Sequence, residues 1–182
     1  MTREPLDPAL LRFVPLALEH LPLLHTWLNH DHVAAWWHER PTYAEVVAEY
    51  TPSITGADPT HGYIIRYGEA PAGFIQWYRI ADYPEYAAAL AVEPGAIGVD
   101  LFIGEAVWLH RGLGSAALRR FVREVVFADA AHASCVIAPE PANRAAIRAY
   151  EKAGFRYLRT VTVPGEPAPE YVMRLARAEA LT

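Results

Sequence analysis

The order of the patterned segments is the feature that most limits the folds open to this chain. Short apolar or alternating runs predict strands at 11–16, 63–67, 72–80, 97–103, 132–138, 155–163 and 171–175. Apolar residues at helical spacing predict helices at 18–28, 42–50, 112–127 and 142–153. Residues 82–93 carry a weak pattern and are predicted to be irregular. This order predicts an α/β fold of the α+β type, with a central, mostly antiparallel mixed sheet of six to seven strands flanked by about four helices.

Length and charge restrict the partners that we expect. The 182 residues are 53% hydrophobic and contain neither a repeat nor a low-complexity linker, so we expect a single domain over 1–182 with its core at about 10–177. A net charge of -5 does not suit nucleic-acid binding, and no apolar stretch approaches the ~20 residues that span a bilayer. Cys135 is the single cysteine, so no intramolecular disulfide can form. Because no apolar run follows the N-terminal charge, we expect a cytoplasmic protein. We expect it to be a monomer or a weak homodimer.

Residues 109–116 (LHRGLGSA) lie between a predicted strand and a predicted helix. Gly112 and Gly114 let the backbone approach a ligand closely, and the following helix offers unpaired N–H groups that bind phosphate oxygens. Arg111 adds a charged donor. Because the segment lacks the Lys-Ser/Thr pair of a P-loop, we disfavour a nucleotide-triphosphate site. The alternative is that both glycines only turn the chain.

Residues 143–155 (NRAAIRAYEKAGF) form the second candidate motif. They predict a short helix with Ile147 and Tyr150 near one face, which ends at Gly154 before a strand begins at Phe155. The alternative reading is a packing helix in which Tyr150 is a core aromatic residue.

Together the two motifs resemble the acetyl-CoA signature of the GNAT superfamily of N-acetyltransferases. That signature is a Q/R-x-x-G-x-G/A loop followed, after one strand, by N-x-x-A-x-x-x-Y-x-x-x-G-F. The second motif matches at every position, whereas the leading Gln or Arg of the loop is Leu109 here. The resemblance implies a GNAT fold, acetyl-CoA as the cosubstrate, no metal, and direct attack of a neutral amine on the thioester.

By the same resemblance, loop amides hold the pyrophosphate, a strand pairs with the pantetheine arm, and Tyr150 protonates the departing thiolate. The cofactor-binding residues implied are Leu101, Phe102, Ile103, His110, Arg111, Gly112, Leu113, Gly114, Ser115, Ala116, Asn143 and Tyr150.

A narrower resemblance points to the aminoglycoside 6'-N-acetyltransferases. Residues 27–37 (WLNHDHVAAWW) look like that family's W-L-N-x-x-H-(I/V)-x-x-W-W segment, and residues 98–100 (GVD) look like its G-I-D. Residues 144–155 are similar to its R-A-I-R-x-Y-E-K-A-G-F. This resemblance implies acetylation of the 6'-amino group and a role in antibiotic resistance.

A polycationic substrate needs carboxylates in its pocket. Asp100 is the principal catalytic candidate, either as the proton acceptor or as an anion that orients the ammonium, and the alternative is a structural hydrogen bond in a bulged strand. Trp36 and Trp37 can wall a sugar site or pack in the core. The substrate-binding residues that we expect are Trp36, Trp37, Gln76, Asp100, Glu140, Glu166 and Glu170.

Two departures from the narrower family leave the amine open. The family's acid-rich stretch before the central strand reads AAALAVE here, at 87–93. The family also has an aspartate just after the next strand, where this chain reads APE at 138–140, and Glu140 is the candidate substitute. The alternatives are a siderophore-type lysine or hydroxylysine N-acyltransferase, a protein or peptide N-acetyltransferase, and a non-enzymatic acetyl-CoA sensor. The siderophore branch typically has histidine where this chain has Asp100. His30, His32 and His38 match no zinc pattern, so we expect surface or capping roles for them.

Overall fold

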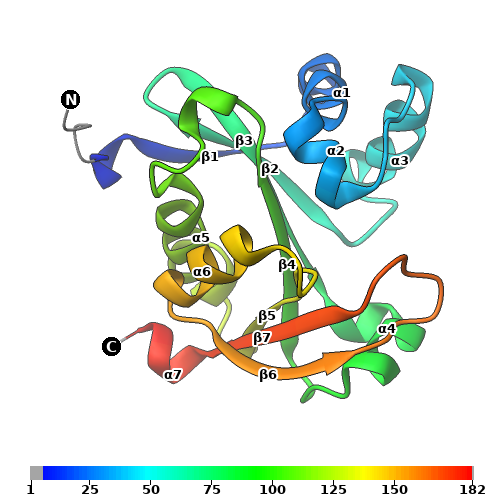
Figure 1. Cartoon of the computed structure of the whole chain (residues 1–182), viewed down its shortest axis with the longest axis vertical. Helices are drawn as coiled ribbons and strands as arrows, with labels where there is room; N and C mark the ends of the chain where they lie inside the picture. The colour runs from blue at the N-terminus through cyan, green and yellow to red at the C-terminus, as the bar shows by residue number, and fades with distance from the viewer. Residues whose placement is uncertain (1–5, 182) are drawn as a thin grey trace. The chain divides into compact units, whose positions relative to one another are not determined.

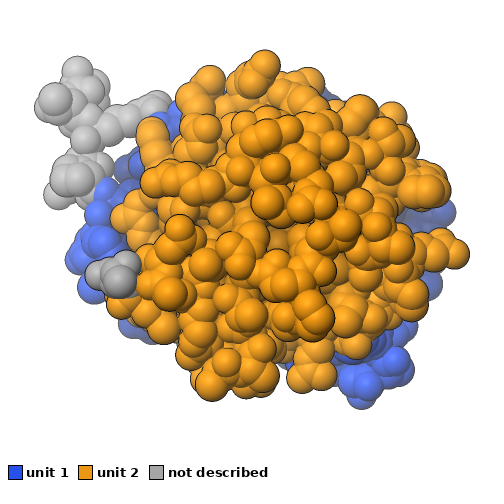
Figure 2. All heavy atoms as spheres, turned by 90° about the horizontal axis from the view of Figure 1, so that it is seen from below, with its two compact units in different colours: residues 1–76, 101–117 blue, residues 77–100, 118–182 orange. Residues whose placement is uncertain are grey.

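The computed structural model describes residues 6–181, and the contacts within the chain divide them into two compact units (Figure 2). Unit 1 comprises the described residues up to Gln76 together with Leu101–Ala117. Unit 2 comprises Trp77–Asp100 and the described residues from Leu118 onward. The single domain expected from the sequence stays a prediction, and each unit is described by itself below.

Within the described residues, seven strands form a mixed sheet in the order β1-β2-β3-β4-β5-β7-β6 (Figure 1). The strands are β1 (Leu11–Pro15), β2 (His61–Tyr67), β3 (Ala70–Arg79), β4 (Ala96–Ile103), β5 (Ser134–Ile137), β6 (Arg156–Val161) and β7 (Glu170–Ala176). β4 and β5 are parallel, whereas β1–β2, β5–β7 and β6–β7 are antiparallel. This confirms the mixed, mostly antiparallel sheet predicted from the sequence.

The four helices that the sequence predicted are all present, with three short ones in addition. The helices within residues 6–181 are α1 (Leu21–Leu28), α2 (Asp31–Trp37), α3 (Tyr43–Thr55), α4 (Pro84–Leu90), α5 (Leu113–Glu124), α6 (Arg144–Ala153) and α7 (Arg177–Ala180). No helix in that range is long and apolar enough to cross a membrane.

The prediction that residues 82–93 are irregular is wrong, because α4 forms there. Pro84 occupies the first turn, where its fixed φ suits a helix and its missing N–H costs nothing. Leu90 is fully buried, and Tyr86 packs against a core cluster of unit 2. The seven-residue helix is therefore held by tertiary contacts, which a short alanine-rich pattern does not reveal.

Three helices of unit 1 pack around one aromatic and aliphatic core. α1 packs against both α2 and α3. The predicted N-cap of α3 is confirmed, because Thr42 accepts from the Glu45 N–H and Glu45 accepts in return from the Thr42 N–H. The buried residues of this core are Leu16, Leu21, Leu24, Trp27, Leu28, Val33, Val46, Tyr50, Ile64, Phe74 and Phe102.

Unit 2 is organised around β5 and β7. Cys135 on β5 is completely buried, which confirms its predicted place in a buried strand. Helix α5 buries Leu118, Phe121 and Val122 completely. Strand β6 pairs with β7 alone among the described strands and exposes most of its residues, so it forms an edge of the sheet.

Candidate active site

In unit 1, the glycine loop passes through two left-handed residues before helix α5. His110 and Gly112 have φ values of 57° and 85°, both in the left-handed region. Helix α5 then begins at Leu113, and Ala116 N donates to Gly112 O over 3.0 Å. The first N–H groups of a helix have no partner within the helix, so those at the start of α5 can donate to an anionic ligand.

Arg111 is held in this loop by aromatic stacking. Its guanidinium carbon lies 4.8 Å from the ring centroid of Trp108, whose ring contacts that of Tyr67 at 4.8 Å. The Arg111 Nε is buried and has no hydrogen-bond partner among the described residues. The stack thus keeps a cation with unused donor capacity beside the loop amides.

Two histidines brace the exit of β4. His32 Nε2 lies 3.0 Å from Ile103 O, and His30 Nδ1 lies 2.9 Å from Gly104 O. Trp27 Nε1 donates to Glu105 over 2.8 Å, and a Cβ on Gly104 would lie 2.2 Å from the Trp27 ring. His30 occupies the N-cap position of α2, as predicted, and its ring also contacts the segment after β4. His32 contacts the end of β4, the strand expected to pair with pantetheine.

His38 does take the predicted capping role, since it ends α2 with a φ of 53°. Within residues 6–181, no three His, Cys, Asp or Glu side chains group as metal ligands.

The two tryptophans expected near the substrate differ in their surroundings. The Trp37 ring meets Phe102 and Phe74 edge-on, at centroid distances of 5.0 and 6.3 Å, so this partly buried side chain packs against the core of unit 1. Trp36 is 41% exposed and can stack on a ligand. Gln76, also predicted to bind the substrate, is half-buried and is the last residue of the first segment of unit 1.

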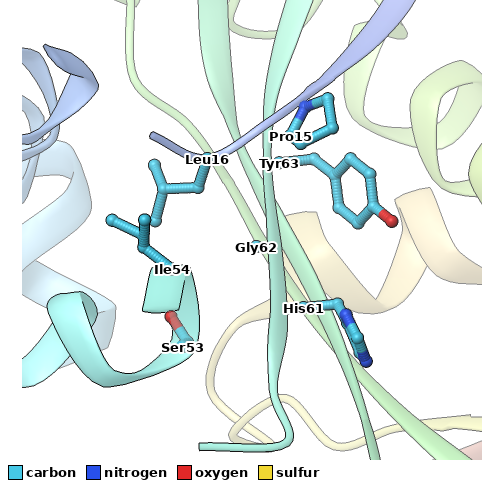
Figure 3. Close-up of a pocket in the computed structure, with 7 residues that line it drawn as sticks. All are labelled: Pro15, Leu16, Ser53, Ile54, His61, Gly62 and Tyr63. Atoms are coloured by element: carbon cyan, nitrogen blue, oxygen red, sulfur yellow. The ribbon is translucent and has the colours of Figure 1, made fainter. Parts of the chain in front are cut away.

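A shallow pocket in unit 1 lies elsewhere (Figure 3). It lies between the end of α3 and the start of β2, and its lining residues are Pro15, Leu16, Ser53, Ile54, His61, Gly62 and Tyr63. The lining contains neither a carboxylate nor any expected site residue, so it does not suit a polycation.

In unit 2, Tyr150 lies on α6 and is 8% exposed. Burial raises the pKa of its phenol well above the ordinary value, and the charge of Asp100 raises it further. The phenol is therefore protonated at neutral pH, as a general acid must be. Asn143 caps α6, because its Oδ1 accepts from Ala146 N over 3.1 Å, so its Nδ2 is the group that can reach a ligand.

Asp100 is the electrostatic centre of a polar cluster in unit 2. Its charge adds to burial in raising the pKa values of Tyr78, Tyr86, Tyr150 and Glu170. The register of β4 with β5 is continuous from Ala96 to Gly98, two residues before Asp100. Asp100 thus shares its electrostatic surroundings with several phenols and a second carboxylate, and its catalytic role stays a prediction.

Sequence reasoning missed the role of Tyr86 in this cluster. Tyr86 Oη donates to Glu170 Oε2 over 2.9 Å, joining α4 to the first residue of β7. Burial raises the pKa of Glu170 to about 7, with smaller upward contributions from Glu166 and Asp100 and a downward one from the Tyr86 hydrogen bond. Pro84, as a helix-start signal two residues before Tyr86, was the clue that the sequence offered.

Three further carboxylates of unit 2 are Glu166, Glu140 and Glu93. Glu166 is exposed and close enough to act on Glu170, whereas Glu140 is half-buried in the loop after β5, where its carbonyl accepts from Asn143 N over 2.9 Å. Glu93 binds Arg174, which lowers the pKa of Glu93 to about 2. Glu93 therefore serves the structure of unit 2 rather than a ligand.

The comparisons with known proteins agree with this geometry. A family model described as an acetyltransferase (GNAT) domain matches residues 17–163. The chain belongs to the GNAT acetyltransferase family.

This acetyltransferase is 36% identical over 157 residues to the aminoglycoside N(6')-acetyltransferase type 1 of Klebsiella pneumoniae, a match that covers 84% of the chain and 78% of the relative. It is 42% identical over 76 residues to a kanamycin resistance protein of Rhizobium radiobacter, across 42% of the chain and 69% of that protein.

Its fold matches a crystal structure of the aminoglycoside acetyltransferase AAC(6')-Ib in complex with coenzyme A and kanamycin, with a TM-score of 0.84 and 32% identity. That match covers 93% of this chain and 96% of the other. The GNAT fold and the family predicted from the sequence are confirmed, whereas the roles of individual site residues stay predictions.

Proposed function

We propose that this acetyltransferase moves the acetyl group of acetyl-CoA to the 6'-amino group of aminoglycosides and so confers resistance to them. The observation that carries the proposal is its 36% identity, over 84% of its length, to an aminoglycoside N(6')-acetyltransferase. Structures of AAC(6')-Ib with kanamycin, and with ribostamycin and coenzyme A, support the same substrate class. We assign the reaction to the cytoplasm, where acetyl-CoA is available.

For acetyl-CoA, we assign the pyrophosphate to the amides of residues 110–116 and to the Arg111 guanidinium. The left-handed turn at His110 and Gly112 and the buried Nε of Arg111 support this assignment. Residues 101–103 would pair with the pantetheine arm through their backbone, and Asn143 would donate to it through Nδ2. Acetyl-CoA in these positions needs no metal ion.

For the amine, we assign Asp100 and Glu170 to the charged groups of the substrate, with Glu166 and Glu140 as outer carboxylates. Asp100 and Glu166 both raise the pKa of Glu170, which supports the assignment of these three carboxylates to one site. Glu140 is assigned from its position in the sequence. Trp36 and Gln76 would contact the sugar rings. We assign no sugar contact to Trp37, because its ring packs against Phe74 and Phe102.

The chemistry begins with a neutral amine beside the thioester. The substrate ammonium has by then lost one proton to solvent. The neutral nitrogen attacks the carbonyl carbon, the C–N bond forms, and the C–S bond breaks as the oxyanion collapses, while the second nitrogen proton replaces the one that Tyr150 donates. Tyr150 gives its proton to the thiolate, which its protonated and buried phenol supports. Each turnover converts one ammonium and one thioester into an amide, a thiol and a proton.

The first test is thiol release from acetyl-CoA with a panel of amines: kanamycin, tobramycin, amikacin, gentamicin, lysine, hydroxylysine and short peptides. We expect turnover with aminoglycosides that carry a 6'-amino group and none with a 6'-hydroxyl analogue. Turnover with lysine derivatives or peptides alone would overturn the proposed substrate while leaving the fold and the family in place. Binding of acetyl-CoA with no thiol release for any amine would indicate a sensor instead.

A further inference from the structure

Two histidine rings from one short stretch of unit 1 hold two successive carbonyl groups where β4 ends. His32 Nε2 lies 3.0 Å from Ile103 O, and His30 Nδ1 lies 2.9 Å from Gly104 O. Because a carbonyl oxygen can only accept, each of these ring nitrogens carries the hydrogen and donates it. The rings use different nitrogens, and their centroids lie 5.6 Å apart. We call His30 and His32 the histidine brace.

The same stretch of chain is also fixed by the end of α1. Trp27 is fully buried, and a Cβ on Gly104 would lie 2.2 Å from its ring, so only glycine fits at this position. Trp27 Nε1 donates to Glu105 over 2.8 Å. The peptide groups on both sides of Gly104 are therefore held by side chains that come from the end of α1 and the start of α2.

The two edges of β4 differ near the end of the strand. On one edge, Gly104 N donates to Ala72 O of β3 over 2.9 Å. Because successive residues of a strand direct their backbone groups to opposite edges, Ile103 directs its N–H and its carbonyl group to the other edge. The register of that edge with β5 runs from Ala96 to Gly98. Beyond Gly98, an extended ligand can pair with this edge in place of a strand.

We propose that the histidine brace positions the end of β4 for the pantetheine arm of acetyl-CoA. The inference rests on the proposed function in placing that arm along residues 101–103. His32 fixes the Ile103 carbonyl, and His30 fixes the next one, so the backbone at Ile103 stays extended before the cofactor arrives. A strand that is already ordered binds more tightly, because binding does not have to order it. Neither histidine is assigned a contact with the cofactor or the amine, so both are positioning residues.

The different ring nitrogens allow a reciprocal substitution test. The side-chain nitrogen of glutamine lies close to the place of a histidine Nε2, and that of asparagine lies close to the place of Nδ1. His32→Gln therefore keeps the donor to Ile103, whereas His32→Asn removes it. For His30 the order is reversed, because His30→Asn keeps the donor to Gly104 and His30→Gln removes it.

Calorimetric titration of coenzyme A into the full-length variants measures the effect. We expect the Kd to rise about 5- to 10-fold in His32→Asn and His30→Gln, as for one lost hydrogen bond, and to stay within about twofold of wild type in His32→Gln and His30→Asn. The KM for the amine should stay near that of wild type in all of them. The control His38→Asn lies at the left-handed end of the same helix, where asparagine is tolerated, and should leave the Kd unchanged.

Hydrogen exchange gives a second readout, which separates positioning from general stability. In wild type, coenzyme A should slow the exchange of the amides of residues 101–103, and His32→Asn should lose most of this protection at Ile103. The melting temperature is measured for each variant, because asparagine at His30 is also a better N-cap than glutamine.

Equal Kd values for the Gln and Asn variants at both positions overturn the proposal, even where the melting temperatures differ, and leave the histidine brace as a support for the fold. Wild-type amides at 101–103 that coenzyme A does not protect overturn it as well. Because neither readout uses an amine, a failure to acetylate aminoglycosides contradicts the proposed substrate and not the role of the histidine brace.

Discussion

The glycine loop of unit 1 and the polar cluster of unit 2 are built in opposite ways. The loop consists of consecutive residues whose backbone does the work, with His110 and Gly112 in left-handed conformations and Arg111 stacked on Trp108. The cluster consists of side chains from separate elements, as in the hydrogen bond that joins Tyr86 to Glu170 across 84 positions. A backbone site can be read as a local motif, whereas a side-chain site depends on which elements the fold brings together.

The comparison predicts that substitutions in the cluster impair turnover and that substitutions in the loop impair cofactor binding. The largest effect should come from Asp100→Asn, which keeps the shape but removes the anion that holds the ammonium. We expect kcat/KM for the amine to fall by roughly 10²–10³-fold, as when one partner of a hydrogen-bonded charge pair is removed, with an unchanged KM for acetyl-CoA. Steady-state thiol release measures both, and Asp82→Asn, at an exposed position, is the control. A parallel rise in the KM for acetyl-CoA would contradict the prediction that the cluster does not contribute to cofactor binding.

Arg111→Ala tests the other half of the comparison. Losing a charged hydrogen bond to phosphate costs about 1.5–3 kcal/mol, so the Kd for coenzyme A should rise by about 10- to 100-fold. Calorimetric titration of coenzyme A measures the change, and kcat at saturating acetyl-CoA should stay near wild type. Arg123→Ala, at an exposed position on α5, should leave the Kd unchanged. An unchanged Kd for Arg111→Ala would show that the guanidinium only packs on Trp108.

The Glu93–Arg174 ion pair gives a pH-dependent stability that is separate from catalysis. The folded-state pKa of Glu93, about 2, lies below its ordinary value of 4.5, so the pair stabilises the fold above about pH 4.5 and loses this effect as the pH falls towards 2. Because both side chains are about one-third exposed, we expect Glu93→Gln to cost about 1 kcal/mol at pH 7 and progressively less below pH 4.5.

Urea unfolding across this pH range provides the measurement for Glu93→Gln. Glu124→Gln, in the more exposed pair with Arg120, should cost only a few tenths of a kcal/mol. A cost for Glu93→Gln that is independent of pH would contradict the assignment.

The smallest effect concerns the strained turn of the loop. His110→Gly removes a side chain from a left-handed position and should stabilise the protein by up to about 1 kcal/mol. His61→Gly, in the extended backbone of β2, should destabilise it by a similar amount. Thermal unfolding of the two variants in parallel separates backbone strain from side-chain loss. Destabilisation by both would mean that the His110 side chain itself supports the loop.

Sequence reasoning succeeded where structure depends on nearby residues. The N-cap at Thr42, the helix end at Gly154 and the turn at Gly112 follow from local backbone chemistry and are present. It failed for α4, whose seven residues are held by distant contacts. It also could not assign His30 and His32, because their backbone partners Gly104 and Ile103 lie more than 70 positions away.

The most direct test of the central claim is to locate the transferred acetyl group. The enzyme is incubated with kanamycin A and acetyl-CoA labelled with carbon-13 at the carbonyl, and the product is analysed by two-dimensional NMR. The account predicts one labelled amide, on the 6'-nitrogen, and its near-complete loss in Asp100→Asn. Label on another amine of the antibiotic, or none on the antibiotic at all, would contradict it.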